Sequence, residues 1–288
     1  MKDRLFIALQ YLIPQHGLSR LVRWATRLTH PAFKNGLIRY FMRAFRPDLS
    51  DAANPDPYGY ASFNEFFTRA LRSGARPLDP SEAIIVSPVD GTVSECGPIV
   101  AGKLIQAKGH DYSVAELLGG AAPWSSEFEA GEFATIYLAP YNYHRIHMAI
   151  AATLREAWYL PGQLFSVNQT TARHVPRLFA RNERIVCCFE NAQLRHALVM
   201  VGALNVGSMD TVWHGEVAPQ ARRMPTRLGA APLHAPLTLA RGAELGRFNM
   251  GSTVILLFPR DQMSWSPSMW PGRILRMGEA IGRLAPGS

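Results

Sequence analysis

Residues 248–258 read FNMGSTVILLF, and this stretch decides how the rest of the chain is interpreted. The run 253–258 begins with β-branched residues, stays apolar, and predicts a buried strand. Gly251 and Ser252 stand directly before that run, where glycine leaves its carbonyl unshielded and serine places a hydroxyl one residue beyond it. The Gly251–Ser252 bond is therefore a candidate site of self-cleavage through an acyl shift from nitrogen to oxygen. A tight turn that enters a core strand is the plainer alternative.

Two other segments supply the acid and the base that such a cleavage needs. Asp90 lies in a turn flanked by proline and glycine, and His144 and His147 lie at the end of another apolar stretch. A serine hydroxyl attacks a peptide carbonyl only when a base removes its proton, and neutral imidazole is the usual base. A carboxylate then fixes the imidazole tautomer and stabilises its cation. Asp90, His147 and Ser252 therefore form a candidate catalytic set.

Each of these residues also has a simpler interpretation. Asp90 before a glycine is typical of a turn residue that bonds its own backbone. Two histidines three residues apart are compatible with a metal site, but no Asp or Glu completes a short zinc motif around His144 and His147, and no metal is predicted. What favours the catalytic interpretation is that all the segments occur together.

The combined segments resemble those of bacterial phosphatidylserine decarboxylases, a pyruvoyl-dependent, self-processing family. The resemblance covers about residues 5 to 260. It is carried by residues 63–67 (FNEFF), 87–93 (SPVDGTV), 106–110 (QAKGH), 141–148 (YNYHRIHM), 160–168 (LPGQLFSVN), 178–184 (LFARNER), 201–203 (VGA), 206–208 (VGS) and 250–253 (MGST). Met250 departs from the family's usual leucine, and methionine is a flexible apolar substitute of similar volume. Residues 219–239 and the tail after residue 259 match nothing in the family pattern.

The resemblance implies the activity and the cofactor. The precursor would cut itself between residues 251 and 252 into a β chain (1–251) and an α chain (252–288), which stay together as a heterodimer. Ser252 would become a covalent pyruvoyl group, which replaces pyridoxal phosphate and requires no metal. Through a Schiff base with this group, phosphatidylserine would lose CO2 and leave as phosphatidylethanolamine.

The resemblance also implies roles for single residues. His147, oriented by Asp90, would take the proton of Ser252 during self-cleavage. His144 would be the candidate proton donor during decarboxylation, and Ser166 a candidate substrate-binding residue. A serine hydrolase with the same Asp, His and Ser, or a non-catalytic protein that binds lipid surfaces, are the alternative functions.

The positive charge is concentrated at the N-terminus. The first fifty residues hold nine of the 30 Lys and Arg residues but only two acids, so they carry most of the net charge of +8. Apolar residues recur there at helical spacing beside the cations, and Pro14, Pro31 and Pro47 separate or end the helices. Such helices suit the surface of an anionic bilayer, although an ordinary amphipathic hairpin packed on the core fits equally well.

The rest of the sequence sets the architecture and location. We expect an α+β chain: amphipathic helices in a membrane-associating segment (1–50), then a predominantly antiparallel β catalytic domain (51–288). A capping box at Ser113 and Glu116 predicts one interrupting helix. Three cysteines without metal-ligand spacing favour a reducing compartment, and no apolar run is long enough to span a bilayer. We therefore expect peripheral attachment to the cytoplasmic face of the cell membrane, phosphatidylserine as partner, a possible higher homo-oligomer, and no nucleic acid.

Overall fold

The computed structural model describes residues 2–107, 109–120, 124–204, 207–218, 224–229 and 236–286. Lys108 and Val206 of the quoted segments, and much of the unmatched stretch 219–239, lie outside the described residues. The helices are α1 (Lys2–Leu12), α2 (Gln15–Thr26), α3 (Pro31–Phe45), α4 (Phe63–Phe67), α5 (Val114–Leu118), α6 (Trp124–Phe128), α7 (Gln169–His174) and α8 (Leu178–Arg181). The predicted capping box is present at the start of α5.

The strands follow the N-terminal helices, which confirms the predicted α+β class. They are β1 (Ile84–Val86), β2 (Gly91–Pro98), β3 (Lys103–Ala107), β4 (His110–Ser113), β5 (Glu132–Leu138), β6 (Arg145–His147), β7 (Ala152–Leu160), β8 (Arg184–Glu190), β9 (Arg195–Val201), β10 (Met209–Thr211), β11 (Gly215–Val217), β12 (Thr226–Arg227), β13 (Thr238–Leu239), β14 (Glu244–Phe248), β15 (Ser252–Phe258), β16 (Met263–Trp265), β17 (Ile274–Leu275) and β18 (Ala280–Leu284). Each apolar run that predicted a strand lies within one of them.

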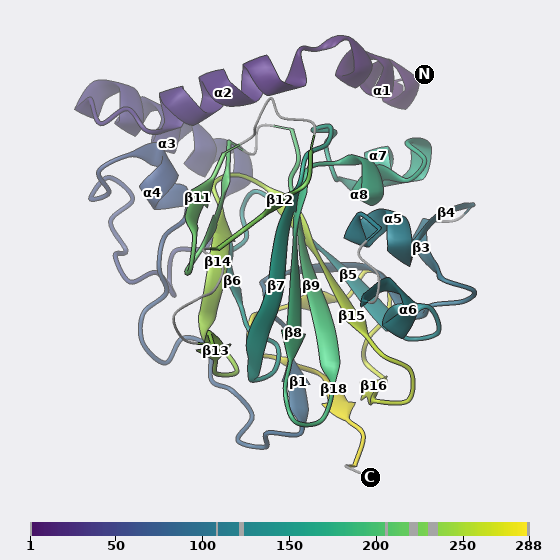
Figure 1. Ribbon diagram of the computed structural model, residues 1–288. Coiled ribbons are helices and arrows are strands. Elements are labelled where there is room, and N and C mark those ends of the chain that lie inside the picture. The colour runs from purple at the N-terminus through teal and green to yellow at the C-terminus, as the bar shows by residue number, and fades with distance from the viewer. Residues whose placement is uncertain are drawn as a thin grey trace.

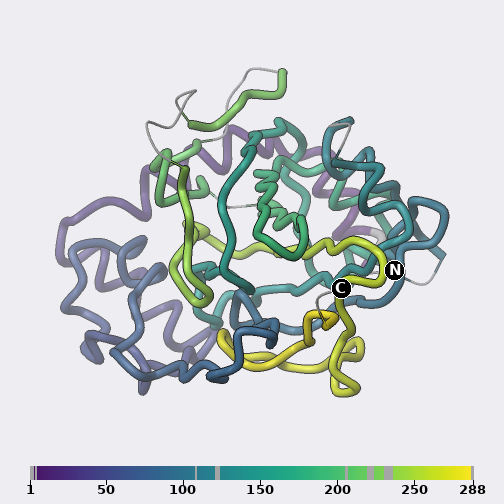
Figure 2. Tube along the Cα trace, turned by 60° about the horizontal axis from the view of Figure 1, so that its bottom comes forward, coloured from purple at the N-terminus to yellow at the C-terminus, as the bar shows by residue number. Residues whose placement is uncertain are grey.

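The strands form one large antiparallel sheet and three smaller ones. The large sheet has the order β12-β7-β8-β9-β15-β5-β2-β17, with β13 also paired to β7. The smaller sheets are β11-β10-β14-β6, β1-β18-β16 and the hairpin β3-β4. Figures 1 and 2 place the N-terminal helices at one end of these sheets and the C-terminal strands β16 and β18 at the other.

Strand β15 lies at the centre of the core. All seven of its residues are buried, and it pairs with β5 on one side and β9 on the other. Burial on both faces explains why its sequence is continuously apolar rather than alternating. The ladder with β5 begins with Ser252 opposite Leu138, so the residue of the candidate cleavage bond is the first one fixed in the sheet.

The N-terminal helices pack against this core with one face. The Gln10 amide on α1 accepts a hydrogen bond from the backbone N–H of Ser166 at 2.8 Å. Ile38 and Phe41 on α3 are buried with the aromatic rings of α4, and the Phe41 ring lies 5.4–6.0 Å from three of those rings. The helices are therefore part of the fold rather than a detached segment.

The other face of the same helices exposes large apolar side chains. Leu12 is 80% exposed, Trp24 61% and Tyr40 68%. In the described part of the chain, no helix combines the length and the hydropathy needed to cross a bilayer. Packing on the core thus accounts for one face of these helices, and the membrane interpretation of the exposed face stays a prediction.

Residues 51–59, which lie between α3 and α4, are fixed to the rest of the structure by contacts on both sides. Asp51 pairs with Arg76 at 2.6 Å, and the buried Lys34 ammonium on α3 donates to the Tyr58 carbonyl at 2.7 Å. These contacts hold α3 and α4 in a defined relation although the connecting chain has no regular structure.

We expect Phe41→Ala to destabilise the docking of α3, because truncating a buried phenylalanine typically costs about 3–5 kcal/mol. Chemical denaturation should show the loss, and limited proteolysis should cut between α3 and α4 sooner. Tyr40→Ala on the exposed side of the same helix is the matched control and should change stability by less than about 0.5 kcal/mol. Equal effects of the two substitutions would contradict the buried packing of Phe41.

Candidate active site

The Gly251–Ser252 bond lies at the buried start of β15. Ser252 is completely buried, and its hydroxyl oxygen has no hydrogen-bond partner among the described residues. Gly251 does not adopt a left-handed backbone conformation, and an added Cβ would lie 3.7 Å from the Leu138 carbonyl oxygen. Glycine is therefore not required here by backbone geometry, contrary to one part of the sequence argument. What remains of that argument is that the Gly251 carbonyl belongs to a residue without a side chain and stands next to the unpartnered Ser252 hydroxyl.

His144 carries a free lone pair in a buried position. Its Nδ1 lies 2.8 Å from the Asn142 carbonyl oxygen, so Nδ1 must hold the proton and donate it. Its Nε2 is buried and has no partner among the described residues. Burial lowers the pKa of His144 to about 3, which leaves the ring neutral at physiological pH. The neutral Nε2 can therefore act as a base.

His147 has both ring nitrogens engaged. Its Nδ1 lies 2.9 Å from the Gly242 carbonyl oxygen, which again assigns the proton to Nδ1, and its Nε2 lies 2.9 Å from the Tyr143 hydroxyl. Burial raises the pKa of Tyr143, so this hydroxyl keeps its proton and donates it to Nε2. Burial also lowers the pKa of His147, although the hydrogen bond to Gly242 and the charge of Glu244 oppose that shift.

Asp90 is bound to groups other than His147. One carboxylate oxygen accepts from the Met277 N–H at 2.7 Å, and the other accepts from Arg76 at 2.8 Å. No hydrogen bond joins Asp90 to His147 in the described part of the chain, but its negative charge does act to raise the pKa of that histidine. Its influence on His147 is thus electrostatic rather than by direct contact.

The two histidines serve different sides of the site. Arg145 and His147 stand two residues apart on β6, so their side chains point to the same face. They line a polar pocket of about 270 Å³ together with Tyr143, Arg76 and Glu244. The His144 ring instead packs on Phe67 with the ring centres 4.2 Å apart. Its backbone carbonyl accepts from the Phe248 N–H at 3.0 Å, four residues before Ser252. His147 thus lines the polar pocket, whereas His144 packs against an aromatic ring of α4.

An apolar cavity of about 420 Å³ borders the candidate bond. The residues around it come from α2, α3, α4 and the segment before β15: Val22, Ala25, Thr26, Leu37, Tyr40, Phe41, Phe45, Phe63, Phe67, Tyr137, Pro140, Ser166, Val167, Ala203, Leu204, Met250 and Gly251. Phe67 therefore lies between this cavity and the His144 ring. Ser166 lies in the wall of this cavity. Met250, which stands where the family usually has leucine, also lines the cavity.

Sequence reasoning missed three residues that shape this site. Arg76 holds Asp90, Tyr143 occupies His147, and Phe67 covers His144. Tyr143 and Phe67 stood inside segments already quoted, but nothing in the sequence specified their contacts. No motif or pattern in the sequence pointed to Arg76. In the residues that the structure describes, no group of three or more His, Cys, Asp or Glu side chains is arranged to bind a metal.

Comparison with known proteins identifies the family of this chain. Residues 63–283 match the family model described as phosphatidylserine decarboxylase, and residues 5–46 match a second model, PSD. The chain is 51% identical over 286 residues to the phosphatidylserine decarboxylase proenzyme of Pseudomonas fluorescens strain Pf-5, covering 99% of both chains. It is 50% identical over 285 residues to the proenzyme of Azotobacter vinelandii, covering 99% of this chain and 100% of that one. This chain therefore belongs to the phosphatidylserine decarboxylase family.

Proposed function

We propose that this protein cleaves itself at Gly251–Ser252 and then converts phosphatidylserine to phosphatidylethanolamine and CO2. One observation carries the proposal: the Ser252 hydroxyl is buried and unpartnered directly after Gly251, which lines an apolar cavity. A buried hydroxyl without a partner costs about 1–3 kcal/mol, and here no hydrogen bond keeps the oxygen from attacking the neighbouring carbonyl.

Self-cleavage uses groups that the chain already holds. The Ser252 oxygen attacks the Gly251 carbonyl carbon while a base takes the hydroxyl proton, and the peptide bond becomes an ester. Loss of the proton on the Ser252 Cα then expels the Gly251 carboxylate and leaves dehydroalanine at residue 252. Addition of water releases ammonia and leaves a pyruvoyl group at the start of the small chain.

Ser252, Asp90, His144 and His147 are the residues that we propose for this chemistry. For the cleavage step the hydrogen bonds support His144 as the base, because its Nε2 is free while Tyr143 already occupies His147 Nε2. This division differs from the one that the resemblance implies. His147 and Asp90 then support the site through their hydrogen bonds to the Gly242 carbonyl and the Met277 N–H, and the Asp90 charge acts on His147.

The surroundings of Ser252 fit a pyruvoyl group and its substrate. When formed, the group would supply the carbonyl that binds the substrate amine and draws off the electron pair as CO2 leaves. The phosphatidylserine amine is an ammonium ion in water and must lose a proton before it reacts. His144 Nε2 accepts that proton. After CO2 has left, the same nitrogen donates a proton to the substrate carbon. The walls of the cavity are mostly apolar and include Ser166. They would hold the part of the lipid nearest the headgroup.

Attachment to the membrane follows from where the cavity opens. Tyr40 and Phe45 line the cavity and are also exposed on α3, so an apolar path runs from the helix surface to Gly251. Exposed apolar side chains and cations on α1–α3 suit peripheral binding to anionic lipid. The three free thiols support the cytoplasmic face of the cell membrane as the location.

We expect purified protein to contain a small chain that begins with a pyruvoyl-blocked residue 252, and Ser252→Ala to remain one full-length chain. Intact mass spectrometry measures both. Thr253→Val is the matched control, because this neighbouring hydroxyl is also buried and unpartnered among the described residues but lies beyond the bond. A wild-type protein that stays in one piece would favour a serine hydrolase instead.

We expect His144→Ala to slow self-cleavage by about 10²- to 10⁴-fold, the usual loss for a general base, and His147→Ala to slow it less. Time courses on denaturing gels give the rates. Because burial lowers the pKa of the proposed base His144 to about 3, its ring stays neutral, and the wild-type rate should be flat from about pH 6 to 8. Prompt cleavage of His144→Ala with a blocked His147→Ala would restore the assignment from the resemblance.

We expect replacement of the exposed Leu5, Leu12 and Trp24 by serine to weaken binding to liposomes that contain phosphatidylserine, while self-cleavage continues. Decarboxylation in bilayers should then fall more than decarboxylation of a dispersed short-chain substrate. Serine at Val100, Ile105 and Ile274, which are exposed apolar residues outside the helices, is the control and should leave binding unchanged. Equal effects of the two triple variants would place the membrane contact elsewhere.

A further inference from the structure

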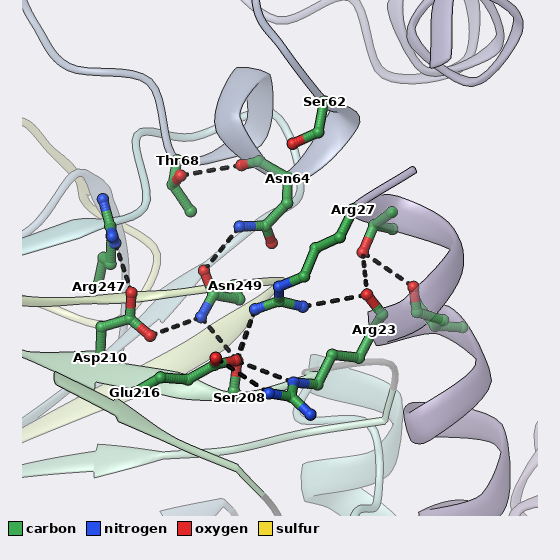
Figure 3. A network of polar contacts seen from close by, with 12 residues as sticks. Arg23, Arg27, Ser62, Asn64, Thr68, Ser208, Asp210, Glu216, Arg247 and Asn249 are labelled. Carbon is green, nitrogen blue, oxygen red and sulfur yellow. Dashed lines mark hydrogen bonds and ion pairs between the residues drawn. The ribbon is translucent and has the colours of Figure 1, made fainter. Parts of the chain in front are cut away.

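The residue two positions before Gly251 is held by a polar network that the proposed chemistry does not use. Asn249 is 2% exposed, and its amide nitrogen donates to the Ser208 hydroxyl at 2.7 Å and to the Asp210 carboxylate at 2.8 Å. Its amide oxygen accepts from the Asn64 side chain at 3.0 Å. Figure 3 shows these partners converging on Asn249 from α4 and from the segment that leads into β10. Both hydrogens of the amide nitrogen and the amide oxygen therefore each have a specific partner.

The network continues from Ser208 to helix α2. The Ser208 hydroxyl donates to Glu216 at 2.5 Å, and the same carboxylate accepts from Arg23 at 2.9 Å and from Arg27 at 2.6 Å (Figure 3). Burial by itself raises the pKa of Glu216, but the hydrogen bonds from Arg23 and Ser208 and the charges of both arginines lower it to about 2. Glu216 therefore stays ionised at any pH that the cell reaches.

Backbone packing brings α2 equally close. A Cβ added at Gly207 would lie 2.7 Å from the Arg23 Cβ and 3.1 Å from its Cα, so the helix rests directly on the main chain beside Ser208. The helix surface is thus linked to the cleavage segment by one continuous set of contacts. We call this set the Asn249 network: Asn249, Asn64, Ser208, Asp210, Glu216, Arg23, Arg27 and Arg247.

Asn249 fixes the chain where the sheet does not. The ladder of β14 ends at Phe248, and the ladder of β15 begins at Ser252. Between them the Asn249 N–H donates to the Ser208 carbonyl at 3.0 Å, next to the side-chain contacts. Attack on the Gly251 carbonyl requires that the carbonyl stay in line with the Ser252 hydroxyl, and a misplacement of about 1 Å can cost roughly 10²-fold in rate.

We propose that Asn249 is a positioning residue for self-cleavage, and that its network makes helix α2 part of the processing machinery. The proposal rests on the proposed function, because it concerns the same bond. Helix α2 would then have two roles, one toward the lipid and one toward the Gly251–Ser252 bond. The network acts before the pyruvoyl group exists, so it affects how fast the precursor matures.

Asn249→Asp provides the most specific test. An ionised carboxylate at 249 still accepts from Asn64 but has no proton to donate to Ser208 or Asp210. Burial and the negative charges of Asp210 and Glu216 raise the pKa of such a carboxyl. The positive charges of Arg23, Arg27 and Arg247 oppose this rise. Lowering the pH protonates the carboxyl and restores a donor.

The experiment follows self-cleavage of the full chain after cell-free synthesis, on denaturing gels, from pH 7.5 to 5.5. Asn249→Ala should cleave about 10- to 100-fold more slowly than wild type at every pH. Asn249→Asp should be equally slow at pH 7.5 and recover several-fold at pH 5.5, whereas the wild-type rate should not rise. Asn191→Asp, in a turn of the distant β8–β9 connection, is the matched control and should behave as wild type.

Several outcomes would overturn the proposal. Wild-type rates for Asn249→Ala would exclude a positioning role, and an Asn249→Asp variant that is slow at every pH with a lowered melting temperature would reduce the residue to structural support. Glu216→Gln keeps the side-chain shape and should slow cleavage several-fold, with Arg20→Gln on the exposed side of α2 as control. An unchanged rate for Glu216→Gln would remove α2 from the mechanism. Failure of the wild-type chain to cleave would instead refute the proposed function.

Discussion

The antiparallel ladder of β15 is the constraint on which the site depends. Its seven residues are buried between β5 and β9, and the first of them is Ser252. A strand held on both sides cannot shift by one residue without turning every side chain to the opposite face. The hydroxyl of Ser252 is therefore fixed in depth and direction, while Gly251 directly before it lies outside the ladder. The ladder therefore holds only one side of the Gly251–Ser252 peptide bond.

Burial then sets the acid–base properties around this bond. A neutral imidazole is the stable form in a low-dielectric interior, and His144 is buried completely, with Asn142 fixing which nitrogen carries the proton. The unpartnered Ser252 hydroxyl and His144 Nε2 each carry a desolvation cost of about 1–3 kcal/mol. The surrounding strands offset such local costs, which are common at functional sites.

The N-terminal helices hold part of their positive charge inside the molecule. Arg23 and Arg27 are bound to Glu216, and the Lys34 ammonium donates to the Tyr58 carbonyl. Fewer of these cations are therefore free to meet an anionic surface than the sequence count suggests. Large apolar side chains, such as Leu12 and Trp24, remain exposed on the same helices. The cavity between α2 and α3 joins this surface to the cleavage segment.

The sequence by itself determined the helix boundaries at the N-terminal prolines, the apolar strands, the family, and the segments that hold Asp90, His144, His147 and Ser252. These follow from local signals: helical or strand periodicity, turn residues and short motifs. The strands β7 and β14 were not anticipated, because charged residues interrupt their apolar pattern and their burial depends on neighbours far away in the chain.

Only the tertiary structure decided which partner each polar group has. Arg76 reaches Asp90, Asn249 reaches Ser208, and the Met277 N–H reaches Asp90 across 187 residues of the chain. Hydrogen bonds are short and directional, so the partner of a side chain depends on the packing of whole strands and helices rather than on its sequence neighbours. For that reason the motif at residues 141–148 identified two candidate histidines, but only the fold showed that His144 Nε2 is the ring nitrogen with a free lone pair.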